Sequence, residues 1–569
     1  MGACVLFACE TTQVPEESGE TAPPAAVTTA ALEAGLAALL PDVSLGGNTE
    51  YNGIILPEVW PPKDVDTQND RVLTPPYLLS AEEGGYLPEV INITTGRQLF
   101  VDDFLIAETN LERVFHRPEK SALNPIFFPE TAVELRSTDP GAAPISGGIW
   151  YDMEEKLWKM WYEAGWNHRL AYATSQDGIH WDRPAVQSNG GNLVLTNAQV
   201  DSTTVYLNYN AENLDERYLL FLRAPGGAET GASLYTSADG LSWQLKGRTA
   251  NLGDRSTIFY NPFREKWVYS IRRSTKVRYG ASVLSQRTRY YAECDDLLKG
   301  ADFSENQVFW LKTDYGDKRE QGSLIAPQLY NFDAVGYESI MVGMFQIWYG
   351  PENDICKTGR FPKTTELQAA YSRDGFHFDR PDRTAFIAAT RTEGSWDRGY
   401  VQSVGGGLVY DDDTMYFYYA GFAGEYEIVP GYTVKGMHVG SSVGLATMRR
   451  DGFASMEGSG ELLTNTLTIE GAYPTLYVNA TGRVSAEILA PDGTVLPGYS
   501  FNDCIPAEGD STMQAITFAG GDLSTLDGQA FRIRFRVESG ALYSFWLSDD
   551  SGDSRGATAA GYVAEGFAG

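Results

Sequence analysis

One strand, turn and strand pattern recurs along the middle of the chain. In each copy, apolar or aromatic residues run up to an Asp-Gly pair, and an aromatic or apolar side chain begins the next strand. The pairs are Asp177-Gly178, Asp239-Gly240, Asp374-Gly375 and Asp451-Gly452, and a weaker copy ends at Asp296. Asp-Gly is typical of tight turns, and the flanking residues suit pleated strands. We interpret these aspartates as turn residues, because a single active site would not repeat in every unit.

Two further strands precede each copy. In the first unit they cover residues 148–151 and 157–162, with a polar hairpin between them. Five units of about four strands predict a five-bladed β-propeller. The fifth unit lacks an outer strand after Asp451. We expect residues 98–106 to supply it, since an unpaired edge would leave the ring open.

The sequence changes character on both sides of this propeller, which we place at residues 98–456. Residues 457–549 alternate apolar and polar positions, which predicts a C-terminal β-sandwich. The fold class is therefore all-β, a five-bladed propeller followed by a sandwich. Residues 27–97 read as an N-terminal extension with a short helix, and the Gly- and Ala-rich residues 550–569 as a flexible tail.

The first residues carry a candidate export signal. Leu6-Phe7-Ala8-Cys9 resembles a bacterial lipoprotein cleavage box with Cys9 as the lipidated residue, and residues 1–26 would form this signal and its tether. The alternative is an apolar start without function. We expect an extracellular or cell-surface protein that meets a membrane only through a lipid at Cys9, because no run reaches the roughly 18 apolar residues of a membrane helix.

Charge and cysteine usage limit the partners. The formal net charge of −31 argues against nucleic acid or an anionic membrane and favours a neutral substrate. Cys294, Cys356 and Cys504 lie far apart, in neither a disulfide framework nor a metal-binding spacing. We predict no cofactor and no metal. With 569 residues, 43% of them hydrophobic, the chain should form more than one domain.

Strand ends select the candidate site. In a propeller the inner strand begins at the ligand-facing mouth and the second strand ends there, where Glu163 is also found. The expected catalytic residues are Asp254, Asp201, Glu134 and Glu320, and the expected substrate-binding residues are Trp166, His168, Arg223, Arg255, Arg272, Tyr349, Asp397 and Gln402. Glycosidic cleavage needs one acid, one base or nucleophile, and a flat apolar face for the sugar.

Asp254 carries the sharpest of these expectations. It should work with Asp201 and with Glu134 or Glu320, and Arg255 beside it should keep it ionised, while a glutamate in an apolar setting holds the proton. Structural alternatives stay open. Asp201 and Asp254 could cap turns, and Glu134 and Glu320 could be solvated loop residues.

With these repeats, the chain resembles the five-bladed furanosidase superfamily, glycoside hydrolase families 32, 43 and 68, and is most similar to family 32 in its domain layout. Residues 252–257, Leu-Gly-Asp-Arg-Ser-Thr, come nearest to that family's Arg-Asp-Pro block. Its Trp-Met-Asn-Asp-Pro-Asn-Gly block is absent from the first blade, and Glu293-Cys294 falls in the outer repeat, so the chain resembles an outlying family.

The resemblance implies an exo-acting glycoside hydrolase for furanoside-type glycans such as fructan or arabinan. Two alternatives remain open. One is a carbohydrate-binding propeller without turnover. The other is a glycoside phosphorylase in which Arg255, Arg272 and Arg273 hold phosphate.

Overall fold

The structure is a computed structural model, and it describes residues 45–564 except 64, 136–137, 188–189 and 227–228. The box at Cys9, its tether and the helix expected in residues 27–97 lie outside the described residues. Within the described ranges, no helix is long and apolar enough to cross a membrane.

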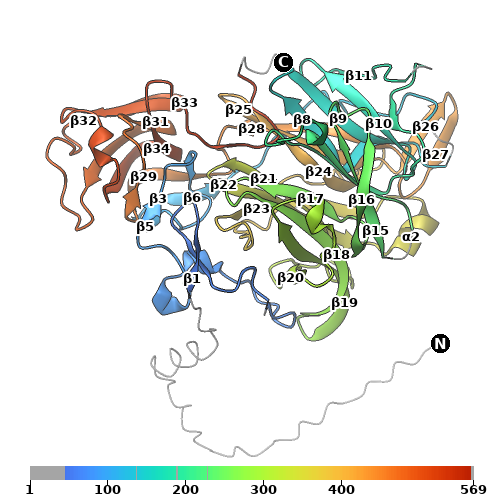
Figure 1. Cartoon of the computed structure of the whole chain (residues 1–569), viewed down its shortest axis with the longest axis horizontal. Coiled ribbons are helices and arrows are strands. Elements are labelled where there is room, and N and C mark those ends of the chain that lie inside the picture. The colour runs from blue at the N-terminus through green and yellow to red at the C-terminus, as the bar shows by residue number, and fades with distance from the viewer. Residues whose placement is uncertain (1–44, 64, 136–137, 188–189, 227–228, 565–569) are drawn as a thin grey trace, which may run out of the picture. The chain divides into compact units, whose positions relative to one another are not determined.

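Five antiparallel sheets form the blades of a β-propeller, as predicted (Figure 1). The first blade contains β8 (Ala142–Asp152), β9 (Leu157–Ala164), β10 (Arg169–Ser175) and β11 (Trp181–Asp182), with β12 (Leu193–Leu195) also paired to β10. The second contains β13 (Ser202–Leu207), β14 (Tyr218–Arg223), β15 (Thr230–Ser237) and β16 (Gln244–Leu252). The third contains β17 (Thr257–Asn261), β18 (Lys266–Tyr279), β19 (Ser282–Cys294) and β20 (Val308–Leu311).

The last two blades complete the ring. The fourth contains β21 (Gln328–Glu338), β22 (Ile340–Gly350) and β23 (Thr364–Ser372), with helix α2 (Asn353–Gly359) between the last two. The fifth contains β24 (Gly399–Tyr410), β25 (Thr414–Phe422), β28 (Ser441–Arg449) and β7 (Glu119–Lys120). The hairpin of β26 (Glu425–Val429) and β27 (Tyr432–Lys435) follows β25.

The repeated turn has the expected chemistry. In the first blade the Ser175 hydroxyl accepts hydrogen bonds from the backbone N–H groups of Asp177 and Gly178, and Asp177 accepts two more from the backbone after it. Gly178 has a φ of 71°, which favours glycine. The turns at Asp239 and Asp374 repeat this pattern. These aspartates are confirmed as turn residues.

The fourth copy differs. Asp451 is fully buried and accepts hydrogen bonds from Arg97, Tyr337 and Ser544. It therefore anchors the segments that join the propeller to the C-terminal module.

The strand that closes the ring was assigned to the wrong residues. The outer strand of the fifth blade is β7, in which Lys120 pairs with Ala446. The expected segment, residues 98–106, instead contributes β4 (Gln98–Leu99), which pairs with β34 (Arg532–Ser548), and leads into β5 (Ile106–Thr109), which pairs with β29 (Ala454–Thr464). Both segments precede the first blade, and residues 106–109 cover an edge of β29 that would otherwise be exposed.

The C-terminal module is an eight-stranded antiparallel sheet (Figure 1). Its other strands are β6 (Glu112–Phe115), β31 (Thr475–Leu489), β32 (Cys504–Ile505) and β33 (Ala507–Phe518). Its core includes Ile54, Tyr77 and Ile91 from the N-terminal extension. This module is thus built from both ends of the chain, and its division into the two layers of a sandwich stays a prediction.

Short elements hold the extension in place. They are β1 (Leu45–Thr49), β2 (Ile55–Pro57) and β3 (Ile91–Asn92), which pairs in parallel with β30 (Leu467–Thr468). Short 3-10 helices lie at Pro76–Leu78, Ala81–Glu83, Leu214–Glu216, Lys299–Ala301 and Ser524–Leu526.

The segment expected to be a flexible tail returns to the propeller. β35 (Ala557–Thr558) pairs with the last residues of β21, and Ala560 and Val563 are buried in the core of the first blade. Its glycines permit close approach: a Cβ on Gly561 would lie 2.6 Å from the Tyr151 carbonyl oxygen. The small side chains of this segment, which suggested that it had no core, therefore allow it to pack closely against the propeller.

Buried side chains fasten neighbouring blades to each other. Trp161 of the first blade donates to the Gly240 carbonyl of the second across 2.7 Å, and Trp310 of the third donates to Phe376 of the fourth across 2.6 Å. Tyr418 of the fifth blade donates to the Gly178 carbonyl of the first across 3.0 Å. The repeated turns thus also accept bonds from neighbouring blades, which fastens the blades together at the end of the strands opposite the mouth.

Candidate active site

Asp201 and Arg223 mark the mouth of the propeller on the second blade. Asp201 directly precedes inner strand β13, and Arg223 ends second strand β14, so the pairing of these strands places both at one end. The Asp201 N–H donates to the Arg223 carbonyl across 3.0 Å. Both residues therefore lie where strand geometry predicts.

Two guanidinium groups hold the Asp201 carboxylate. Arg223 donates to its Oδ2 and Arg255 to its Oδ1, each across 2.6 Å. All three side chains are at least nine-tenths buried. Asp201 is thus already saturated by cations, and its role in the geometry is to orient Arg223 and Arg255.

Asp254 is the accessible carboxylate of the mouth. Its side chain is 38% exposed, and Arg272 Nε lies 3.4 Å from its Oδ1. Burial opposes its charge, but Arg272, Arg255 and other nearby arginines lower its pKa below the ordinary range. Gly253 makes this pair possible, since a Cβ there would lie 2.4 Å from Arg272 Cδ. Asp254 is therefore an ionised carboxylate open to a ligand.

Glu163 is the opposite kind of carboxyl. It lies near the end of β9, is 1% exposed, and accepts one hydrogen bond at Oε2, from the Asn167 N–H across 3.2 Å. No described residue hydrogen-bonds its Oε1. Burial raises its pKa well above the ordinary value; Arg255 opposes the rise and Asp201 adds to it. Glu163 is thus suited to carry a proton at neutral pH.

Aromatic rings form the walls beside these carboxyls. Trp166 stacks on His438 at 4.0 Å between ring centroids, and the Arg255 guanidinium lies 5.0 Å from the Trp166 ring. His168 ends the same short turn, where its N–H donates to Gly165. Burial, then Lys363 and Arg255, lower the pKa of His438 well below its usual value. A neutral, flat surface of this kind suits a sugar ring.

Tyr330 lies in the inner strand of the fourth blade, beside one cation from its own blade and one from the third. Lys363 donates to the Tyr330 hydroxyl across 2.7 Å, and the Arg287 guanidinium lies 5.1 Å from the Tyr330 ring. Lys363 precedes β23 and Arg287 lies in β19, both third strands, which begin at the mouth. They were not among the expected residues because the rule was applied to first and second strands alone. Extending it to the start of third strands would have found Lys363, whereas Arg287 lies inside β19.

Four expected residues have charged or hydrogen-bonding partners outside this group. Glu134 is fully buried and accepts hydrogen bonds from Tyr162, Arg183 and the backbone of Glu130 and Thr131. Burial opposes its charge, but Arg183 and the other donors lower its pKa, so it is a poor proton donor.

The others have their own partners. Glu320 forms an ion pair with Arg391 at 2.6 Å. The Tyr349 hydroxyl accepts from Gln368 at 3.2 Å. Asp397 accepts from Lys120 at 2.5 Å and so fastens the outer strand of the fifth blade. The expected partnership of Asp254 with Glu134 or Glu320 therefore stays a prediction, although both glutamates already have arginine partners.

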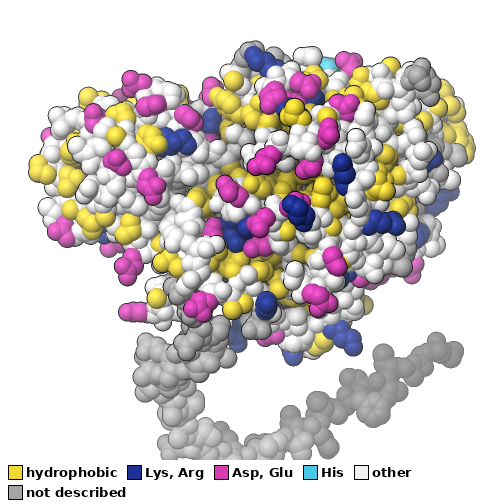
Figure 2. Space-filling model, viewed as in Figure 1, with side chains coloured by type: hydrophobic (Ala, Val, Ile, Leu, Met, Phe, Trp, Pro, Cys, Tyr) yellow, Lys and Arg dark blue, Asp and Glu magenta, His cyan; other side chains and the backbone are white. Residues whose placement is uncertain are grey.

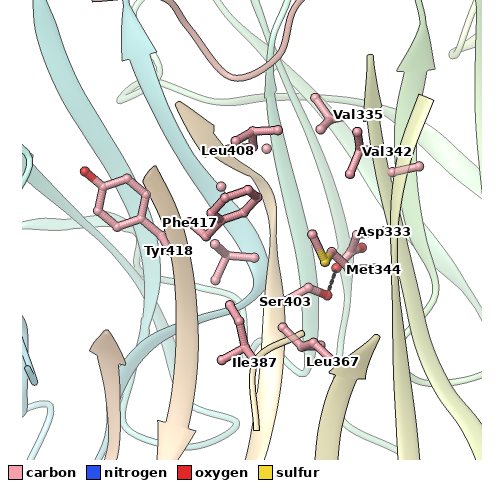
Figure 3. A pocket seen from close by; sticks show the side chains of 14 residues that line it. Asp333, Val335, Val342, Met344, Leu367, Ile387, Ser403, Leu408, Phe417 and Tyr418 are labelled. Carbon is pink, nitrogen blue, oxygen red and sulfur yellow. Dashed lines mark hydrogen bonds between the residues drawn. The ribbon is translucent and has the colours of Figure 1, made fainter. Parts of the chain in front are cut away.

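Gln402 lies deeper, on the propeller axis. It donates to the Ser146 hydroxyl across 2.7 Å, and Asn331 donates to the same oxygen across 2.9 Å. Beside them, Asp333 and Ser403 share a hydrogen bond at the wall of a cavity of about 40 Å³ (Figure 3). That volume suits a water molecule and is too small for a sugar ring.

Solved structures with similar folds include carbohydrate-active enzymes. A fructofuranosidase from Schwanniomyces occidentalis complexed with fructosylnystose is 12% identical, covering 76% of this chain and 98% of its own, with a TM-score of 0.36. The β-1,2-mannobiose phosphorylase from Listeria innocua is 12% identical, covering 58% and 96%, with a TM-score of 0.39. An endo-arabinase from Bacteroides thetaiotaomicron is 11% identical, covering 54% and 97%, with a TM-score of 0.32.

No protein family and no curated protein matches the sequence. Because every one of these TM-scores is below 0.5, the assignment of five blades rests on the strand pairing within this chain.

Proposed function

We propose that the chain is a glycoside hydrolase that cleaves its substrate at the propeller mouth. The observation that carries this proposal is the contrast between two carboxyls that interact with one arginine, Arg255. Asp254 is accessible with a lowered pKa, and Glu163 is buried with a raised one. Two carboxyl groups whose pKa values are shifted in opposite directions are suited to act as the acid and the base of one reaction.

In the proposed reaction Glu163 protonates the leaving oxygen as the glycosidic bond breaks. Asp254 supplies the negative charge that the oxocarbenium-like transition state needs, as nucleophile or as base for water. Asp201 acts through Arg255 and Arg223, which it orients. Trp166 provides the face on which the sugar ring packs.

The finer expectations stay part of the proposal. Exo-action on fructan- or arabinan-type glycans is supported by the resemblance to the furanosidase families. Export to the cell surface is supported by the Leu6-Phe7-Ala8-Cys9 sequence. Phosphorolysis is the second candidate, because Lys363 and Arg287 add positive charge beside Asp254. Arg273, expected to take part in it, pairs with Glu229 at 2.6 Å.

The test is release of sugar from inulin, levan and arabinan oligosaccharides by the purified chain, with and without phosphate. Glu163→Gln and Asp254→Asn should each lower the rate by about 10²-fold or more. Glu155→Gln is the matched control, because Glu155 lies in the hairpin at the other end of the same strand. Full turnover by Glu163→Gln would refute the assignment of the acid, and no cleavage of any glycan would leave binding as the function.

A further inference from the structure

Positive charge exceeds negative charge at the mouth. Two carboxylates, Asp201 and Asp254, face five cations, namely Arg223, Arg255, Arg272, Arg287 and Lys363. Glu163 adds no charge when protonated. The chain as a whole carries −31, and acidic side chains are scattered over the face seen in Figure 2. A cationic centre in so acidic a protein points to a specific ligand.

Lys363 is the least compensated of these cations. It is 1% exposed, and it donates a hydrogen bond to the Tyr330 hydroxyl across 2.7 Å. Among the described residues, no carboxylate lies within ion-pair distance of Lys363. A buried ammonium group without an anion is costly, so proteins rarely retain one without a use.

Arg287 repeats this situation on the same ring. It donates to the amide oxygen of Gln328 across 2.8 Å and packs 5.1 Å from the rings of Tyr330 and Trp348. In the described part of the chain it too has no carboxylate partner. Two cations therefore meet at Tyr330, and in the described residues neither forms an ion pair with a carboxylate.

Arg255 supplies an independent sign of a missing ligand. Its side chain is 2% exposed, and one terminal nitrogen, Nη2, binds Asp201. Its Nη1 and Nε are buried with no hydrogen-bond partner in the described residues. Buried donors of a charged group are normally satisfied, so these are positioned to bind a ligand.

We propose that the mouth binds an oxyanion between Lys363, Arg287 and Arg255, beside Tyr330. This inference deepens the proposed function and rests on it for the identity of the ligand. The oxyanion is either inorganic phosphate or an acidic group carried by the glycan. From the total charge we expected a neutral substrate. We now propose an anionic ligand instead, because the mouth is positively charged although the whole chain is negatively charged.

With phosphate as the group that accepts the sugar, the atoms and charges of the reaction balance. The bond between the anomeric carbon and the leaving oxygen breaks, and Glu163 protonates that oxygen. A phosphate oxygen forms the new bond to the anomeric carbon, and the proton of the phosphate group returns to Glu163. No oxidant or reductant is needed.

Calorimetric titration of the full chain tests the site without any turnover. Sodium phosphate and sodium galacturonate are each titrated at constant ionic strength set with chloride. We expect saturable binding of at least one, weakened about tenfold or more by Lys363→Met and by Arg287→Met. Lys246→Met, on exposed strand β16, is the matched control. Thermal melts establish that each variant is folded.

The outcomes separate the two sources. Binding of phosphate together with phosphate-dependent sugar release identifies phosphate as co-substrate, whereas binding of galacturonate alone identifies an acidic glycan. No binding of either ligand by the wild type, or equal binding by the folded Lys363→Met variant, overturns the proposal. Sugar release without anion binding would refute this site alone, and anion binding without any cleavage would refute the hydrolase alone.

Discussion

Arg289 donates a hydrogen bond from Nη1 to the backbone carbonyl of Arg255 across 2.5 Å. Arg255 has a φ of 60°, a conformation that is uncommon for a side chain of this size. Arg289 is fully buried, and its Nη2 donates to the Tyr330 carbonyl, also across 2.5 Å. One side chain thus fixes the backbone of two residues that define the mouth. Burial lowers the pKa of Arg289 to about 9, with Asp333 opposing the change.

Replacing Arg289 by Met should loosen the mouth. Two buried carbonyls would lose their donor, at about 1 to 3 kcal/mol each in the free energy of unfolding. We expect a lower denaturation midpoint and weaker phosphate or galacturonate binding, because Arg255 would lose its strained backbone position. The control is Arg248→Met, at an exposed position of β16. Anion affinity that survived in the folded variant would show that Arg289 does not position Arg255.

Glu163→Gln should stabilise the protein at neutral pH while it removes activity. The folded-state pKa of Glu163 lies above its ordinary value of 4.5, because of burial, so the folded chain retains a proton that the unfolded chain releases. Stability is therefore complete below about pH 4.5 and falls as the pH rises toward the folded-state pKa, by about 1.4 kcal/mol per unit. Gln stays neutral and escapes this loss.

Thermal melts from pH 4 to pH 8 test the direction in which stability changes with pH. The variant should match the wild type at the acid end and exceed it at the alkaline end. Glu134→Gln is the comparison, since its lowered pKa predicts a loss of stability at neutral pH that shrinks as the pH falls. Parallel curves for Glu163→Gln and the wild type would mean that Glu163 is ionised.

Gly253→Ala should disconnect Arg272 from Asp254. The new Cβ would lie 2.4 Å from Arg272 Cδ, so the arginine must move away from its position 3.4 Å from Asp254. Without that neighbour the pKa of Asp254 should rise, and the acid limb of the pH–rate profile should shift upward. Gly247→Ala is the control, because open space surrounds Gly247. An unchanged acid limb would show that another group titrates there.

The blades were predictable because their signal is local. Ser175, Asp177 and Gly178 form a turn through bonds spanning three residues or fewer, so the motif alone identifies it. The choice of β7 over residues 98–106 for the fifth blade was not predictable. Both precede the first blade, and which one pairs with β28 depends on the edge that β29 offers elsewhere.

The candidate site likewise has features that the sequence predicts and features that it does not. Asp201 and Arg223 were predictable from strand ends, since pairing of adjacent strands places them together. The fate of Glu134 was not, because Arg183, which neutralises it, lies 49 residues away in sequence. The pKa contrast between Glu163 and Asp254 depends on burial, which no sequence pattern records.

The end of the chain allows a last prediction. Truncating the chain after residue 549 should destabilise the propeller and leave the chemistry of its mouth unchanged. The segment places Ala560 and Val563 in the core of the first blade, and the Ser554 hydroxyl donates to the buried Glu338 across 2.6 Å. Glu338 ends β21, and the mouth lies at the other end of that strand.

Gly561→Val tests the same contact with a single side chain. Gly561 has a φ of 134°, and its Cβ would lie 2.6 Å from the Tyr151 carbonyl oxygen, so Val must push the segment off the blade. We expect a melting temperature about 2 degrees lower, as about 2 kcal/mol gives in a chain of this size, with anion affinity unchanged below the melt. Gly247→Val, in open space, should leave both unchanged. If Gly561→Val had the same melting temperature as the wild type, residues 550–563 would not contribute to the stability of the propeller.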